Sequence, residues 1–380
     1  MTTLPDFSLE VYLGKWEFAA RWHMTPSEAQ TLTIKELLAL ADPADRAAWE
    51  ELPLGYIETW GTPKLRAAIA ATYTGIAVDD VLAFAGAEEG IYCAMHALLT
   101  KDDHAIVVTP NYQSAEQVPL ALCATEGVAL RPERNWDLDL DELAARIRPS
   151  TKLISINFPH NPTGKIIDRA TFDALVALCR KHGIWLFSDE VYRGLEFDPA
   201  KRLPAATEVY ERGLSLGVMS KSYGLPGLRI GWVLSKDHAL LSRMERMKHY
   251  LSICNAGPSE HLAVIALKAR DQVVGRNAAL ARENLKAVEA FFAEYPGLFE
   301  WYRPDGGCIA YPRYLGTDGV EAFATRMVEE SGIVVLPSSI YRSSLGPTPT
   351  DRFRIGFGRI YTKDGLEAMR QHLGRNRSAA

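Results

Sequence analysis

Between residues 81 and 234, short apolar runs alternate with segments whose apolar residues recur at helical spacing. Residues 104–108, 152–157 and 184–188 are rich in β-branched or aromatic side chains and too short for helices, so they predict buried strands. Residues 141–147 and 170–182 predict helices between them. This alternation is typical of an α/β fold with a mostly parallel sheet between helices.

Polar residues stand where these predicted strands end. Asn161 follows the 152–157 strand, Asp189 directly follows the 184–188 strand, and Lys221 follows a further strand. Sheets of this kind bind ligands outside the carboxyl ends of their strands. We therefore expect these three side chains to meet in one site.

The pattern changes after residue 242. A long helical stretch over 259–295 precedes strand-like pieces at 307–311, 333–336 and 353–357, separated by helices near 319–330 and 363–373. This pattern predicts a smaller C-terminal α/β domain. We expect an N-terminal segment (1–45) that packs with the small domain and over the site, a large domain (46–250), and an interdomain helix with the small domain (251–380).

Composition excludes several classes of protein. A net charge of -5 argues against nucleic acid as the main partner, which needs a basic surface. No apolar run approaches the roughly 18 residues of a membrane span, and the first residues lack the features of a signal peptide, so a cytoplasmic protein is expected. Five widely spaced cysteines without CxxC, and histidines without HExxH spacing, predict no disulfide framework and no metal site.

The most informative stretch covers residues 220–232, Ser-Lys-Ser-Tyr-Gly-Leu-Pro-Gly-Leu-Arg-Ile-Gly-Trp. It places Lys221 between small residues and Arg229 eight positions later. A lysine that forms an imine must lose its proton, which burial or a nearby cation promotes. Arg229 would supply such a cation and could also hold a phosphate by charge-assisted hydrogen bonds.

This stretch resembles the lysine motif of the class I/II aminotransferases, which belong to the fold-type I pyridoxal-phosphate enzymes. Three further motifs in the order of that family extend the resemblance over nearly the whole chain: Asn161-Pro-Thr-Gly, Asp189-Glu-Val-Tyr192 and Phe-Arg354-Ile-Gly. The resemblance implies a large domain with a seven-stranded-type sheet that binds pyridoxal 5'-phosphate, and a smaller C-terminal domain.

The resemblance also assigns roles. Lys221 would form the Schiff base with the cofactor and then move a proton at the substrate Cα. Asp189 would pair with the protonated ring nitrogen, because a carboxylate there raises the pKa of that nitrogen. Tyr192 and Asn161 would hydrogen-bond the ring oxygen, and Arg354, with Asn161, would bind the substrate carboxylate as a bidentate fork.

The phosphate would lie at the start of a helix that follows the strand-like 81–84, because backbone amides there point at an anion. Ala87 and Glu88 are the expected amide donors, with Arg229 and Ser220 as further contacts. One position departs from the family pattern: Val218 stands three residues before the lysine, where many relatives have Ser or Thr. Arg229 and the two amides would then carry more of the phosphate binding.

The remaining assignments concern the rim of the site. Tyr112 matches the aromatic residue that stacks on the cofactor, and Tyr56 matches the tyrosine that reaches the phosphate across a dimer interface. The resemblance thus implies a homodimer with composite sites. Because relatives fold the N-terminal segment over the site, Glu17 and His23 are candidate contacts for the substrate side chain, and Glu17 could face a cationic group.

These motifs leave the reaction open. Transfer of an amino group from an L-amino acid to a 2-oxo acid is the most common outcome for such a site. Elimination, replacement, or cyclisation of a hydroxylated arginine, as in the capreomycidine-synthase-like branch, would use the same residues. A non-catalytic regulatory protein would need a DNA-binding domain before residue ~10, where this region already begins.

Overall fold

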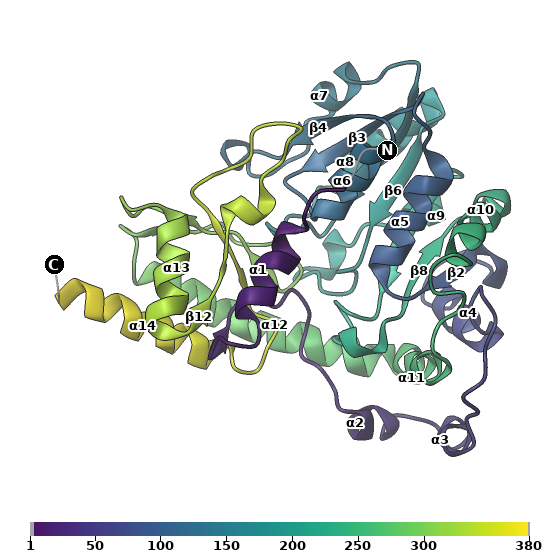
Figure 1. The fold of residues 1–380 in the computed structure, drawn as a ribbon, viewed down its shortest axis with the longest axis horizontal. Helices are drawn as coiled ribbons and strands as arrows, with labels where there is room; N and C mark the ends of the chain where they lie inside the picture. The colour runs from purple at the N-terminus through teal and green to yellow at the C-terminus, as the bar shows by residue number, and fades with distance from the viewer. Residues whose placement is uncertain (1–3, 379–380) are drawn as a thin grey trace.

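A seven-stranded sheet forms the centre of the computed structural model, which describes residues 4–378 (Figure 1). In spatial order the strands are β2 (Val81–Phe84), β8 (Gly231–Leu234), β7 (Gly213–Val218), β6 (Trp185–Asp189), β5 (Thr151–Asn157), β3 (His104–Thr109) and β4 (Ala124–Ala129). β8 is antiparallel to both of its neighbours, whereas all pairings from β7 to β4 are parallel. The predicted mostly parallel sheet is therefore confirmed.

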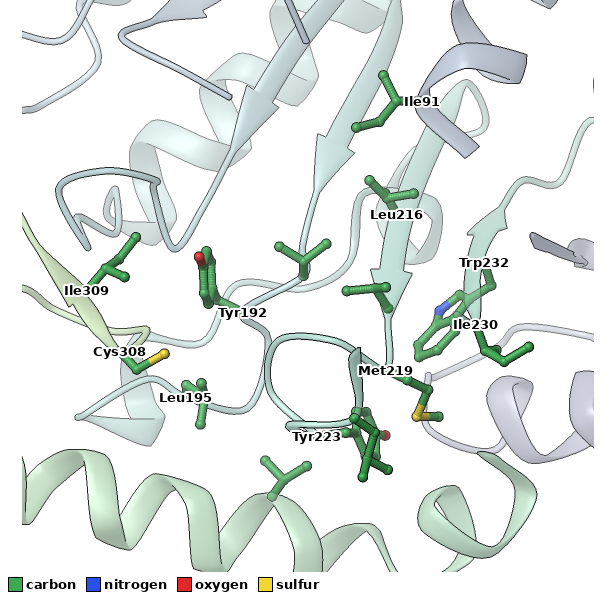
Figure 2. Close-up of a cluster of buried hydrophobic side chains, with 14 of the residues drawn as sticks. Ile91, Tyr192, Leu195, Leu216, Met219, Tyr223, Ile230, Trp232, Cys308 and Ile309 are labelled. Carbon is green, nitrogen blue, oxygen red and sulfur yellow. The ribbon is translucent and has the colours of Figure 1, made fainter. Parts of the chain in front are cut away.

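Helices pack on both faces of this sheet, and the alternation of side chains along the strands explains why. In β6, Leu186 belongs to the apolar cluster that contains α8, and Phe187 belongs to the cluster that contains α5. Successive strand residues point to opposite faces, so an apolar residue at each position demands cover on both. Figure 2 shows part of the second cluster, where Leu216 and Trp232 come from β7 and β8. The helices of this region are α5 (Ala87–Leu98), α6 (Gln113–Leu122), α7 (Leu140–Ala145), α8 (Arg169–His182), α9 (Ala206–Val209) and α10 (His238–Lys248).

Local signals set the ends of α8, which precedes the strand that carries Asp189. The Asp168 side chain accepts a hydrogen bond from the backbone amide of Thr171 at 2.7 Å and caps the first turn. Gly183 ends the helix at φ 66°, a left-handed conformation that glycine adopts without strain. The chain then turns directly into β6.

The C-terminal elements form a second group around a three-stranded antiparallel sheet in the order β10-β14-β13. The predicted long helix over 259–295 is instead two helices, because Ala269 (φ -92°, ψ 21°) leaves the helical conformation between them. The second of these, α12, runs from the C-terminal elements toward α11 in Figure 1, above α2 and α3 in that view. The elements are α11 (Gly257–Lys268), α12 (Arg270–Ala293), β9 (Phe299–Glu300), β10 (Ile309–Ala310), β11 (Arg313–Tyr314), α13 (Val320–Ser331), β12 (Ile333–Val334), β13 (Leu336–Pro337), β14 (Phe353–Gly356) and α14 (Thr362–Ser378).

The N-terminal segment connects these C-terminal elements to the Lys221 loop. Its strand β1 (Trp22–His23) pairs in parallel with β12. The carbonyl of Met24 accepts from the amide of Gly356 at 2.7 Å, and the amide of Ala29 donates to the carbonyl of Lys221 at 3.0 Å. The helices of this part are α1 (Ser8–Trp16), α2 (Ile34–Leu38), α3 (Pro43–Glu50) and α4 (Pro63–Ala70).

Two further findings concern residues 4–378. None of their helices is long and apolar enough to cross a membrane. Their histidines, cysteines and acidic residues form no group of three or more suited to a metal ion.

Candidate active site

A cavity of about 510 Å³ opens at the carboxyl ends of β5, β6 and β7. The sequence predicts thirteen site residues, and all of them except Tyr56 line this cavity. They are Glu17, His23, Ala87, Glu88, Tyr112, Asn161, Asp189, Tyr192, Ser220, Lys221, Arg229 and Arg354. Residues more than 300 positions apart in the chain thus meet in one place; the strand ends predict this for Asn161, Asp189 and Lys221, and the family motif predicts it for Arg354.

Lys221 stands in the loop after β7 and extends its amine into the cavity. Its Nζ donates a hydrogen bond to Oγ of Ser27 at 2.8 Å. Burial lowers the pKa of Lys221, and the neighbouring Glu28 carboxylate acts in the opposite direction. A lowered pKa increases the fraction of neutral amine, the form that can act as a nucleophile or accept a proton.

Asp189 ends β6 on the floor of the cavity. Its Oδ1 accepts from the backbone amide of Val191 at 3.1 Å, and no cation in the described chain forms an ion pair with it. Burial raises the pKa of Asp189 to about 7. A half-buried carboxylate without an ion-pair partner is costly, so this position is suited to a ligand that brings a cationic N–H group.

Arg354 lies on β14 with only 2% of its surface exposed. Its Nη1 donates to Oδ1 of Asn161 at 3.0 Å, and its Nη2 donates to the carbonyl of Thr25 at 2.7 Å. Its Nε has no partner, and no carboxylate within residues 4–378 pairs with this guanidinium. A buried cation surrounded by neutral acceptors needs a negative ligand.

Asn161 and Tyr192 present hydrogen-bond donors to the same cavity. Because Oδ1 of Asn161 accepts from Arg354 and from the hydroxyl of Tyr341, at 3.0 and 3.3 Å, the amide NH₂ of Asn161 remains as a donor. The Tyr192 hydroxyl is buried and makes no hydrogen bond within the described chain. Buried polar groups are rarely left unpaired, so these donors indicate an acceptor on a ligand.

The far end of the cavity lies at the start of α5. Gly86 precedes this helix at φ 97°, and a Cβ there would stand 2.5 Å from Nη2 of Arg229. Glycine thus allows the guanidinium to lie against the helix N-terminus, where an anion is favoured. Glu88 lines the cavity nearby and accepts from Oγ of Ser114 at 3.0 Å. Burial raises the pKa of Glu88.

Several cavity residues were missed by the sequence reasoning: Ser27, Glu28, Asn157, Arg359 and Tyr361. Asn157 could have been found, because it ends a predicted strand; its Nδ2 donates to the carbonyl of Asp189 at 2.9 Å and its Oδ1 accepts from the amide of Asn161 at 2.7 Å. The other four stand in no motif.

Tyr56 does not reach this cavity. Its side chain is 91% exposed, and the side chains of Leu54 and Tyr250 are 87% and 90% exposed. The buried amine of Lys248 holds the backbone just after Tyr56 in place, since it donates to the carbonyls of Thr59 and Ala83 at 2.6 and 2.7 Å. Exposed large apolar side chains on a braced backbone are typical of a protein interface.

Comparisons with known proteins extend this description. Residues 30–372 match the model of the family described as aminotransferase class I and II. The chain is 32% identical over 377 residues to capreomycidine synthase from Streptomyces vinaceus, covering 98% of this chain and 94% of that protein. It is 32% identical over 327 residues to the arginine–pyruvate transaminase AruH from Pseudomonas aeruginosa, covering 83% of this chain and 81% of that protein.

Solved structures give a similar result. A PLP-dependent aminotransferase from Streptococcus suis is 29% identical, with a TM-score of 0.91 over 98% of this chain and 99% of that structure. The PLP-dependent cyclase OrfR is 25% identical, with a TM-score of 0.89 over 99% of each chain.

Proposed function

The chain belongs to the class I and II aminotransferase family of pyridoxal-phosphate-dependent enzymes, and on that premise we propose that it transfers the amino group of an L-amino acid to a 2-oxo acid. The observation that carries this proposal is the presence of two positively ionisable groups in one cavity, Lys221 half-buried and Arg354 buried. Lys221 offers an amine of lowered pKa, and Arg354 offers a guanidinium without a carboxylate partner. An α-amino acid substrate needs an amine that can accept its Cα proton and a cation that can bind its α-carboxylate.

The described residues fit the cofactor. Asp189 is a half-buried carboxylate that forms no ion pair within the described residues, and the Tyr192 hydroxyl is a buried donor without an acceptor there. These would hold the ring nitrogen and the ring oxygen, with Asn161 as a second donor. When bound, pyridoxal phosphate withdraws electrons from the substrate Cα and so weakens the bond to its proton.

The phosphate would be held at the start of α5. The amides of Ala87 and Glu88 begin this helix, and Arg229 lies against its N-terminus. Ser220 lines the same part of the cavity. Tyr112 would cover the cofactor ring, and its own ring is supported by Phe7, with the two centroids 5.2 Å apart.

Lys221 has two tasks in this proposal. It would hold the cofactor through its amine, and once released that amine would accept the proton from the substrate Cα and donate a proton back later in the reaction. Its neutral amine is favoured by burial, and Ser27 keeps Nζ in place within 2.8 Å.

Arg354 and Asn161 orient the substrate. The guanidinium binds the α-carboxylate through two parallel hydrogen bonds, and Asn161 fixes its plane by accepting from Nη1. The N-terminal segment would help to cover the site, since its residues Glu17 and His23 line the cavity as proposed side-chain contacts.

A second copy of the chain completes the proposed site. Leu54, Tyr56 and Tyr250 are almost fully exposed in the single chain, which supports a dimer interface at this surface. Tyr56 would then reach the phosphate in the partner's cavity, since it does not line its own.

Cyclisation or elimination on the same scaffold is the second candidate. Capreomycidine synthase and the cyclase OrfR match this chain over 98% and 99% of its length, and that similarity supports the alternative. Both reactions begin with the same proton removal by Lys221, so these residues serve either outcome.

A screen of amino acids against the holoenzyme separates the two. Each amino acid is supplied with and without a 2-oxo acid, and the oxo-acid product, ammonia and cyclic amino acids are measured. Oxo acid formed together with the pyridoxamine form of the cofactor supports transamination. Ammonia or a cyclic product without that form supports the alternative, and absence of any reaction contradicts both.

A further inference from the structure

One wall of the cavity carries a carboxylate to which the proposed reaction gives no role. Glu28 lines the cavity with a side chain that is 19% exposed. Its Oε1 accepts from Nη2 of Arg359 at 2.5 Å, and no second side chain within residues 4–378 donates a hydrogen bond to this carboxylate. A carboxylate has about four acceptor positions, so Glu28 can still accept from a ligand.

The backbone around Glu28 is placed by direct contact with glycines. A Cβ at Gly356 would stand 2.0 Å from the carbonyl oxygen of Pro26, and one at Gly358 would stand 2.7 Å from that of Glu28. A Cβ at Gly224 would stand 2.4 Å from the carbonyl oxygen of Gln30. The segment therefore lies flat against the Arg354 strand and the Lys221 loop, and its packing fixes where the Glu28 side chain enters the cavity.

Glu28 also lies close to the proposed binding point of the substrate carboxylate. Arg354 donates to the carbonyl of Thr25 at 2.7 Å, and Glu28 is three residues farther along. Three residues span at most about 10 Å. A substrate held by Arg354 can therefore extend a long side chain to Glu28 within the same cavity.

Charge on this wall favours a positive group. Arg359 pairs with Glu28 and orients its carboxylate. Burial opposes ionisation of Glu28, but the charges of Lys221 and Arg359 lower its pKa. Glu10, in α1, and Glu17, directly after it, line the same cavity. They form no ion pair within the described chain, so they add negative potential. Outside the residues proposed to hold cofactor and α-carboxylate, the cavity is thus lined by three glutamates and one arginine.

We propose that Glu28 is the receptor for a cationic group at the end of the substrate side chain, and that the preferred substrates are amino acids with a guanidinium group. A guanidinium presents several N–H donors in a plane, so it can share the carboxylate with Arg359. This inference rests on the proposed function, because it assumes that Arg354 holds the α-carboxylate.

Calorimetric titration of the holoenzyme with unreactive probes tests the inference. The desamino analogues of arginine and citrulline keep the carboxylate and the chain length, lack the reacting amine, and differ only in a guanidinium or a neutral urea group. Wild type should bind the guanidinium probe more tightly. Glu28→Gln should reduce that preference by roughly 10- to 100-fold, the value of one charge-assisted hydrogen bond, and change the urea probe by less than about 3-fold.

Glu50→Gln is the matched control, since Glu50 is exposed on α3 and outside the cavity; it should keep the wild-type preference. Equal affinities of wild type for the two probes would overturn the inference without any variant, so a Glu28→Gln protein that fails to fold leaves the test valid. A third probe replaces the guanidinium by a second carboxylate. If wild type bound this dicarboxylate more tightly than the guanidinium probe, the inference would also be overturned, and this wall would instead bind an anionic side chain through Arg359.

The probes separate this inference from the proposed function. If some amino acid is transaminated but the probe preference is absent, the role of Glu28 is wrong and the function stands. If no amino acid donates its amino group, the function fails, whatever the probes show.

Discussion

Replacing Asp189 by asparagine should make the cofactor-free protein more stable at pH 8, even though it damages the site. Asparagine keeps the shape of the side chain and the acceptor for the Val191 amide. It removes a negative charge whose burial raises the pKa of Asp189 from 3.8 to about 7. In the unfolded chain that pKa returns to its ordinary value.

The sign follows from proton binding. Between pH 4 and pH 7 the folded protein holds the Asp189 proton and the unfolded chain does not, so the free energy of unfolding falls as pH rises. Above pH 7 the charged Asp189 lowers the free energy of unfolding by its full amount, up to about 4 kcal/mol for a pKa shift from 3.8 to about 7. In a chain of this length, that corresponds to a melting temperature about 2–5 °C higher for the cofactor-free Asp189→Asn variant at pH 8.

Thermal unfolding of cofactor-free and cofactor-loaded protein at pH 5 and pH 8 measures this effect. At pH 5 the gain should be smaller, and in the loaded protein the order should reverse because Asp189 then has a cationic partner. Glu190→Gln is the control, since Glu190 is buried outside this cavity and should act equally in both forms. A loss of stability in cofactor-free Asp189→Asn at pH 8 would refute the reasoning.

Three further predictions concern the substrate, the lysine and the phosphate. Arg354→Lys should lower kcat/KM by roughly 10- to 100-fold for every amino acid, mainly through KM, because the bidentate fork is lost. Arg352→Lys, a substitution of a buried residue outside the cavity, should leave KM unchanged. Equal effects of the two substitutions would argue against the role of Arg354. Lys221→Ala should abolish borohydride fixation of the cofactor while the circular dichroism spectrum stays that of wild type; fixation at another lysine would contradict the assignment. Gly86→Ala should weaken cofactor affinity at least 10-fold by equilibrium dialysis, because the new Cβ meets Arg229 at a left-handed φ of 97°, and unchanged affinity would remove the α5 terminus from the site.

The residues at strand ends were predictable because their positions follow from the chain order. Once 152–157 and 184–188 are read as parallel strands, Asn161 and Asp189 must emerge at the same edge of the sheet. The alternation of apolar residues and the caps of α8 are local signals of the same kind. Arg354 was predictable only through a motif, because it reaches the cavity from a different sheet.

Other features depend on packing between distant segments. Nothing near Ser27 or Glu28 marks them in the sequence, because their place results from the pairing of β1 with β12 and from glycines more than 190 residues away. The break at Ala269 has no glycine or proline to announce it. The antiparallel entry of β8 between β7 and β2 likewise has no local signature.

The half-reaction of the holoenzyme with one amino acid, in the absence of any 2-oxo acid, tests the central claim most directly. Cofactor absorbance and oxo acid are followed together, and a 2-oxo acid is added afterwards. The proposed function predicts one equivalent of oxo acid per site, conversion of the cofactor to its pyridoxamine form, and recovery of the original spectrum on addition of the 2-oxo acid. Release of ammonia or of a cyclic amino acid with the cofactor spectrum unchanged at the end would contradict it.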